Sequence, residues 1–272
     1  MIVQAAPGGS AAVVIAQREH TRLAAEFARS FGNDHFAPLQ PRELMEFVAD
    51  NHDRGWDAVD EHMSTDPDTG LPYSLIKTPL ELLLETGPGS PDFCEAHHPW
   101  CGLLVSMHTY GLYNGRYGLS DKIVVNTLPP EQRGPIEAML SHELERQNRL
   151  TRELAASPDT AELASERLLL HNYKLLQFFD TLSLYFNMSV DEQRGEARFA
   201  NVPMAVGEDV TVTVRRVEPG VYSLAPYPFA EQPLVVQMDG RRVEPRPGER
   251  DWAEPLASAP MVREIITLVA AS

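Results

Sequence analysis

One segment that is apolar on nearly every side limits what this chain can fold into. Between Leu168 and Phe186, a helix predicted over residues 160–188 is apolar almost all round, with Asp180 in its interior. A helix of this kind lies at the centre of a domain and is covered by other elements. The rest of the chain must therefore form a shell around it. The Asp180 carboxylate must find a partner there, because an unpaired buried charge costs several kcal/mol.

The spacing of apolar residues divides the remaining chain into a helical part and a strand part. From Gln17 to Met188, apolar residues recur mainly at helical spacing, which indicates helices with one buried face. After Met188 the pattern becomes typical of strands, interrupted by turn signals at Gly207, Pro219-Gly220 and Asp239-Gly240. The chain therefore combines a helical region with a sheet.

The first sixteen residues are predicted to join that sheet. Two apolar runs, MIVQAA and AAVVIA, flank the turn signal Pro7-Gly8-Gly9-Ser10, which is typical of a hairpin. An isolated hairpin is only marginally stable in water, so we expect it to pair with the C-terminal strands. The predicted fold is α+β, with a mainly helical core over residues 17–188 and an antiparallel sheet from residues 1–16 and 194–272.

The charge balance excludes several classes of partner. The chain has 272 residues, with 23 lysines and arginines against 39 aspartates and glutamates, a formal net charge of −16. Binding to nucleic acid requires clustered basic residues, and the same repulsion disfavours anionic membranes. A phosphorylated small molecule is still compatible, because a bound metal reverses the local charge. With two cysteines, no membrane-spanning run and no basic residue before Arg18, we expect a cytoplasmic protein.

The residues that could bind a metal lie in several different predicted helices. His20 falls on the apolar stripe of its helix, and His108 ends the apolar run GLLVSM. His52 ends another stripe and is followed at once by Asp53. Adjacent side chains diverge by about 100° on a regular helix, but at a helix end both can turn toward one point. Together with Asp180, these imidazoles and carboxylates suit a divalent transition metal.

The order of these residues resembles the HD-domain superfamily of metal-dependent hydrolases, whose helical core binds metal through His…His-Asp…Asp. The resemblance implies that His20, His52, Asp53 and Asp180 hold a divalent ion, which could be Mn, Fe, Mg, Ni or Zn. His108 matches an intervening histidine that such proteins often add. It would hold a second metal, orient the substrate or protonate the leaving group. Asp53 and His108 are the predicted catalytic residues.

The same resemblance implies hydrolysis of a phosphoester in a small molecule or nucleotide, with metal-activated water as the nucleophile. One position departs from the family pattern. Many HD phosphohydrolases have a lysine where this chain has Trp56, and that lysine would contact the substrate or leaving group. Arg54, Lys77 and Arg116 are the candidates to replace it.

Two other functions stay open. An HD-type di-iron oxygenase would need His108 and a further histidine, from among His98, His142 and His171. A non-catalytic ligand-binding protein would keep the helical shell alone. The wider phrases HDRGWD, LLVSMHTYGLY, LLQFFDTLSLYF and YPF also resemble a bacterial family catalogued only as a domain of unknown function. We therefore expect a divergent branch of the HD superfamily.

Overall fold

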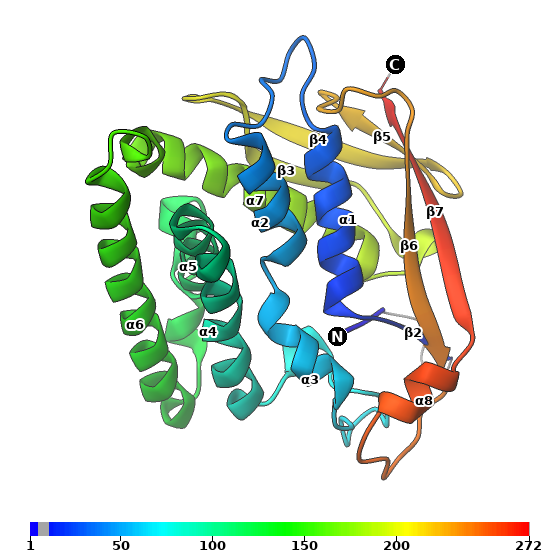
Figure 1. The fold of residues 1–272 in the computed structure, drawn as a ribbon. Helices are drawn as coiled ribbons and strands as arrows, with labels where there is room; N and C mark the ends of the chain where they lie inside the picture. Colours follow the sequence, from blue (N-terminus) through cyan, green and yellow to red (C-terminus); the bar gives the residue numbers. More distant parts are fainter. Residues whose placement is uncertain (5–10, 272) are drawn as a thin grey trace.

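A computed structural model describes residues 1–4 and 11–271, and in these residues helices pack against a seven-stranded sheet (Figure 1). The helices are α1 (Gln17–Ser30), α2 (Arg42–Asn51), α3 (Asp57–Glu61), α4 (Leu80–His97), α5 (Pro99–Tyr113), α6 (Pro130–Ala155), α7 (Glu166–Asn187) and α8 (Ala253–Ser258). The strands are β1 (Ile2–Val3), β2 (Ala12–Ile15), β3 (Ala197–Ala205), β4 (Glu208–Glu218), β5 (Val221–Ala225), β6 (Leu234–Val243) and β7 (Met261–Ala270). The predicted α+β class is confirmed.

The two ends of the chain meet in one sheet, in the strand order β1-β2-β6-β7-β5-β4-β3. β1 pairs antiparallel with β2, and β2 pairs antiparallel with β6, where Ala12 lies opposite Val243. The N-terminal strands therefore do extend the C-terminal sheet, as predicted. The predicted turn at residues 7–10 lies outside the described residues.

The prediction of a purely antiparallel sheet is wrong at one pairing. β5 pairs with β7 in parallel, with Val221 opposite Thr267, whereas the other pairings of described strands are antiparallel. The parallel pair arises because β6 and α8 stand between β5 and β7 in the chain. That connection lets β7 lie between β6 and β5 in the same direction as β5. The sheet is therefore mixed.

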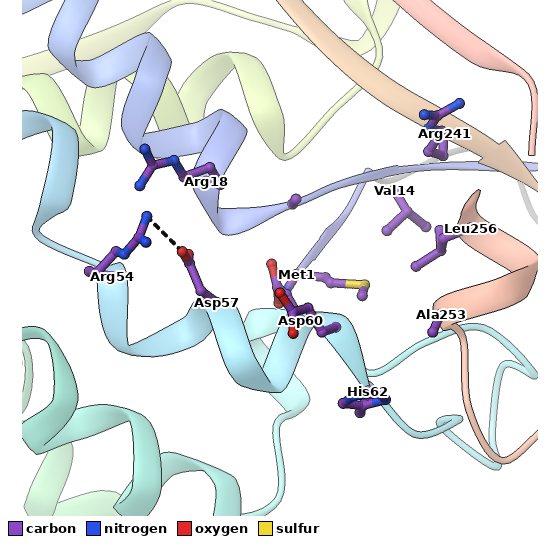
Figure 2. Close-up of a pocket in the computed structure, with 12 residues that line it drawn as sticks. Met1, Val14, Arg18, Arg54, Asp57, Asp60, His62, Arg241, Ala253 and Leu256 are labelled. Carbon is purple, nitrogen blue, oxygen red and sulfur yellow. Dashed lines mark hydrogen bonds and ion pairs between the residues drawn. The ribbon is translucent and has the colours of Figure 1, made fainter.

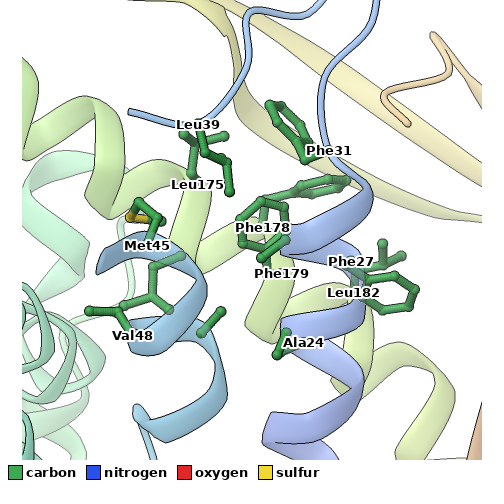
Figure 3. Close-up of a cluster of buried hydrophobic side chains, with 14 of the residues drawn as sticks. Ala24, Phe27, Phe31, Leu39, Met45, Val48, Leu175, Phe178, Phe179 and Leu182 are labelled. Atoms are coloured by element: carbon green, nitrogen blue, oxygen red, sulfur yellow. The ribbon is translucent and has the colours of Figure 1, made fainter. Parts of the chain in front are cut away.

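α7 is the central helix, as its apolar sequence predicts. It packs against α1, α2 and α5 and against β3. Figure 3 shows Phe178 and Phe179 of α7 between Phe27 of α1 and Phe31, which follows α1, on one side and Val48 of α2 on the other. The chain turns through a short 3-10 helix before α7 begins at Glu166. None of the described helices has the length and apolarity needed to cross a membrane.

Candidate metal centre

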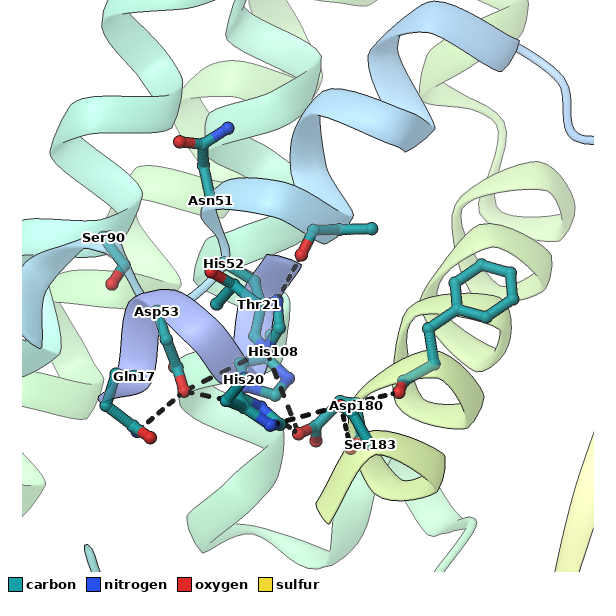
Figure 4. Close-up of polar contacts among 12 residues, drawn as sticks. Gln17, His20, Thr21, Asn51, His52, Asp53, Ser90, His108, Asp180 and Ser183 are labelled. Atoms are coloured by element: carbon teal, nitrogen blue, oxygen red, sulfur yellow. Dashed lines mark hydrogen bonds and ion pairs between the residues drawn. The ribbon is translucent and has the colours of Figure 1, made fainter. Parts of the chain in front are cut away.

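Five side chains predicted from the sequence meet inside the helical layer (Figure 4). They come from α1, the end of α2, α5 and α7, and we call them the histidine–aspartate cluster: His20, His52, Asp53, His108 and Asp180. Candidate ligand atoms of His20, His52 and Asp180 lie within 4.8 Å of one another, as do those of His52, Asp53 and His108. The two groups share His52.

The end of α2 explains how two adjacent residues reach the same point. His52 keeps helical backbone angles, with φ −61° and ψ −24°, directly after the last residue of α2. Asp53 departs from the helix, with φ −112° and ψ 22°. This change of direction removes the divergence that neighbouring side chains have on a regular helix.

The distances within the cluster are close to those of ligands around one ion. His20 Nε2 lies 3.3 Å from Asp180 Oδ1, and His52 Nε2 lies 3.9 Å from the same oxygen. Asp53 Oδ2 lies 4.0 Å from both Nε2 atoms. Ligand atoms about 2.1 Å from a tetrahedral metal lie about 3.4 Å apart. The ligand atoms of His20, His52 and Asp180 approach this spacing, whereas Asp53 converges with His52 and His108.

The second ring nitrogen of each of two histidines is held by a hydrogen bond that fixes its proton. His52 Nδ1 lies 2.9 Å from the carbonyl oxygen of Ala49, and His20 Nδ1 lies 2.9 Å from the amide oxygen Oδ1 of Asn187. Both oxygens can only accept, so both Nδ1 atoms donate and both Nε2 atoms carry a lone pair. These Nε2 atoms are buried and have no hydrogen-bond partner among the described residues. This is the arrangement that metal-ligating histidines adopt.

The electrostatics of the cluster favour a positive charge at its centre. Burial alone would raise the pKa of Asp180, but the neighbouring imidazoles of His20, His108 and His52 hold that pKa far below its usual range. Burial opposes the charged form of His20, yet the carboxylates of Asp180 and Asp53 outweigh it and raise the pKa of His20. The two carboxylates therefore favour positive charge beside His20 Nε2, and a divalent cation bound there would satisfy both of them.

His108 differs from the other two histidines. Its Nδ1 accepts a hydrogen bond of 2.7 Å from the side-chain amide of Gln177, so its proton lies on Nε2. Burial lowers the pKa of His108 to about 4, against the opposing effect of Asp180. His108 is therefore neutral at pH 7 and presents an N–H group, whereas His20 and His52 present lone pairs.

Several residues around the cluster were missed by the sequence interpretation. Gln17 donates to Asp53 Oδ2 over 3.1 Å, and Ser183 and Asn187 contact His20. A signal for some of them was present, because Gln177, Asp180, Ser183 and Asn187 recur every three or four positions along α7. They form a polar stripe on an otherwise apolar helix. The Ala49 carbonyl had no such signal, since it belongs to the backbone.

The additional histidines that a di-iron site would need are not part of the cluster. Among the described residues, His98, His142 and His171 belong to neither group of convergent ligands. His98 caps α5 by accepting a hydrogen bond from the backbone N–H of Trp100. His142 lies exposed on α6 and lines a separate cavity.

The three basic residues considered in place of the HD-family lysine lie in different environments. Arg54 pairs with Asp57 at 2.8 Å on the wall of a cavity of about 640 Å³ (Figure 2). The histidine–aspartate cluster contributes no side chain to that cavity. Lys77 lies 3.4 Å from Asp66. Arg116 makes no ion pair with any described residue.

The fold and the cluster define a mainly helical α+β protein with a buried histidine–aspartate site. The family model described as "Protein of unknown function (DUF3891)" matches residues 1–245, and the chain belongs to this family. Neither the curated proteins nor the solved structures give a match to the chain.

Proposed function

We propose that this protein is a metal-dependent hydrolase that cleaves a phosphoester in a small molecule or nucleotide. The observation that carries the proposal is the pair of buried imidazoles, His20 and His52, whose Nε2 lone pairs have no partner and face two carboxylates. A cluster with a purely structural role would place a donor between these atoms, because an unmade buried hydrogen bond costs about 1–3 kcal/mol. A bound cation removes that cost.

The donor set fits a divalent transition metal. His20, His52, Asp53 and Asp180 would hold it through two imidazole nitrogens and carboxylate oxygens. Mn, Fe, Ni and Zn accept this mixture, whereas Mg prefers oxygen ligands alone. When bound, such an ion supplies a water of lowered pKa as nucleophile and polarises the phosphoryl group.

The protein's own contribution is orientation and proton transfer. Gln17 holds the Asp53 carboxylate, and Asn187 holds the His20 ring, so both ligands are aimed before the ion arrives. His108 presents its Nε2–H beside His52, with their ring centroids 5.2 Å apart. We assign His108 the role of hydrogen-bond donor and general acid toward the leaving group, and Gln177 the role of fixing its tautomer.

The hydrolase is favoured over the di-iron oxygenase by the content of the cluster. A second iron would need ligands beyond His52, Asp53 and His108, and the remaining histidines lie in other environments. The non-catalytic alternative is an outcome of the experiment that follows.

The experiment measures hydrolysis of bis(p-nitrophenyl) phosphate and p-nitrophenyl phosphate by protein loaded with Mn, Fe, Ni, Zn or Mg. We expect turnover that is lost on chelation, is lost in His52→Ala, and falls at least 100-fold in His108→Ala while that variant keeps its metal. The control is His142→Ala, which removes an exposed histidine and should keep full activity. Turnover that is equal in His52→Ala and the parent protein, or absent with every metal on both esters, would contradict the proposal.

A further inference from the structure

A second cavity lies on the far side of Gln177 from His108. It has a volume of about 340 Å³ and is formed by α7, by β3 and by the loop around the 3-10 helix Gly115–Gly118. Three basic side chains line it, Arg116, Lys174 and Arg198, and no carboxylate does. The whole chain carries a net charge of −16, so a cavity in which every charged side chain is positive is unusual for this protein.

Two of the three cations are free to bind an anion. Lys174 is paired with Asp209 at 2.5 Å. Arg116 and Arg198 make no ion pair or side-chain hydrogen bond with any residue in the described ranges 1–4 and 11–271. Two guanidinium groups from separate elements therefore face one cavity without a counter-charge.

The backbone is strained at this cavity. The non-glycine residues with positive φ in the described chain are Arg116, Tyr117 and Asn201, at 50°, 55° and 58°. Arg116 and Asn201 both line the cavity. Such conformations cost about 1–3 kcal/mol each and gather at ligand-binding sites, where they aim a side chain or backbone group.

One side chain, Gln177, links the cavity to the histidine–aspartate cluster. Gln177 lines it and donates to His108 Nδ1 over 2.7 Å. Thr181, which also lines it, follows Asp180 directly on α7. A ligand in the cavity would therefore be separated from His108 by the side chain of Gln177.

The geometry points to this cavity as the binding site for a phosphate group of the substrate, held by Arg116 and Arg198 beside the metal centre rather than on it. That the phosphate belongs to a substrate rests on the proposed function. A phosphate carries about 1.5–2 negative charges at pH 7, which two guanidinium groups can neutralise through paired hydrogen bonds. The hydroxyl of Ser120 supplies a further donor. Arg116 thus takes the part of the lysine that Trp56 replaces.

The test measures binding of inorganic phosphate and pyrophosphate by calorimetry to protein from which metal has been removed by chelation. We expect Arg116→Ala and Arg198→Ala each to weaken binding at least tenfold. Arg250→Ala is the matched control, since it removes one exposed arginine that has no ion pair among the described residues, and should stay within twofold. Arg198 is exposed on β3, so its removal leaves a folded protein even if Arg116→Ala does not fold.

His52→Ala separates this inference from the proposed function. The inference predicts that metal-free His52→Ala binds phosphate as tightly as the parent protein. Unchanged affinity in both arginine variants, or phosphate binding that appears only after metal is added, would overturn the inference and leave the metal centre standing. Tighter binding of succinate than of phosphate would also overturn it, because it would assign the cavity to a carboxylate. Phosphate binding as predicted, in a protein that takes up no metal, would overturn the proposed function alone.

Discussion

Two enclosed polar clusters in this protein each bring carboxylates next to basic side chains, but they satisfy their polar atoms in opposite ways. One is the histidine–aspartate cluster between the helices. The other, which we call the Arg194 cluster, joins the end of α7 to the sheet and consists of Asp191, Arg194, Tyr222 and Glu264. Both are largely enclosed, so each must balance the cost of removing charge from water.

The Arg194 cluster balances that cost within itself. Arg194 has no exposed side-chain surface, and its guanidinium makes five hydrogen bonds, one for each N–H it carries. The acceptors are the carbonyl oxygens of Ser189 and Phe186, the hydroxyl of Tyr222 and both carboxylate oxygens of Glu264. Nothing is left for a ligand.

The histidine–aspartate cluster leaves its inward-facing atoms without partners while securing its outward-facing ones. The Nδ1 atoms of His20 and His52 are hydrogen-bonded, and their Nε2 atoms are not. Burial and charge alone therefore do not distinguish a structural cluster from a ligand site. The distinguishing feature is whether the unpaired atoms converge on one point.

The largest effect on stability is expected in the Arg194 cluster. Arg194→Ala leaves the Glu264 carboxylate without its partner and the Tyr222 hydroxyl without its donor, and should lower the free energy of unfolding by about 3–5 kcal/mol, measured by urea denaturation. Metal content should be unchanged. The control is Arg215→Ala, which breaks the exposed pair with Glu196 and should cost less than about 1 kcal/mol. An equal loss of unfolding free energy in the two variants would show that the Arg194 cluster stabilises the protein no more than an exposed ion pair does.

A smaller effect is expected for the residue that orients His20. Asn187→Ala removes the acceptor for His20 Nδ1, so the ring loses its fixed tautomer and the affinity for metal should fall about 10–100-fold. The affinity is measured by competition with a chromogenic chelator. Asn172→Ala serves as the comparison, because Asn172 is also buried on α7 but donates only to the carbonyl of Leu168. If both variants bind metal like the parent protein, Asn187 has no orienting role.

The smallest effect is the pH dependence of the stability that Asp191 contributes to the Arg194 cluster. The hydrogen bond from Arg216, with those from Tyr222 and Gly220, holds the pKa of Asp191 at about 2. Since this value lies below that of the unfolded chain, about 3.9, the contribution of Asp191 is present above pH 4 and is lost as the pH falls toward 2. The stability difference between the parent protein and Asp191→Asn should therefore shrink over that interval. The exposed Asp121, changed to Asn, should show no such dependence.

Much of the fold could be predicted from the sequence because it depends on local patterns. The apolar segment around Asp180 predicted the central helix, and Gly207 and Pro219-Gly220 lie between strands as expected. The predicted turn at Asp239-Gly240 is wrong, because both residues lie inside β6 and pair with β7. The direction of β7 beside β5 could not be predicted, because strand order depends on contacts across the whole sheet rather than on either strand's own residues.

The candidate site was also predictable only in part. The residues that meet in the cluster were identified by their positions on apolar helix faces and by their order in the chain. The hydrogen bonds that fix the tautomers of the histidines could not be predicted. The partner of His52 is a backbone carbonyl, and the partner of His108 is an amide 69 residues away in the chain. The cavity formed around Arg116 and Arg198 depends on tertiary structure alone.

The most direct test of this account is elemental analysis of protein that was purified without a metal-binding tag. We predict at least one equivalent of a divalent transition metal in the parent protein and in the control His142→Ala. His52→Ala and Asp180→Asn should each retain less than about a tenth of it while staying folded, because each loses one of the convergent ligands. Metal content that is equally low in all four proteins after incubation with Mn, Fe, Ni and Zn, or equally high in all four, would contradict the assignment of a metal centre.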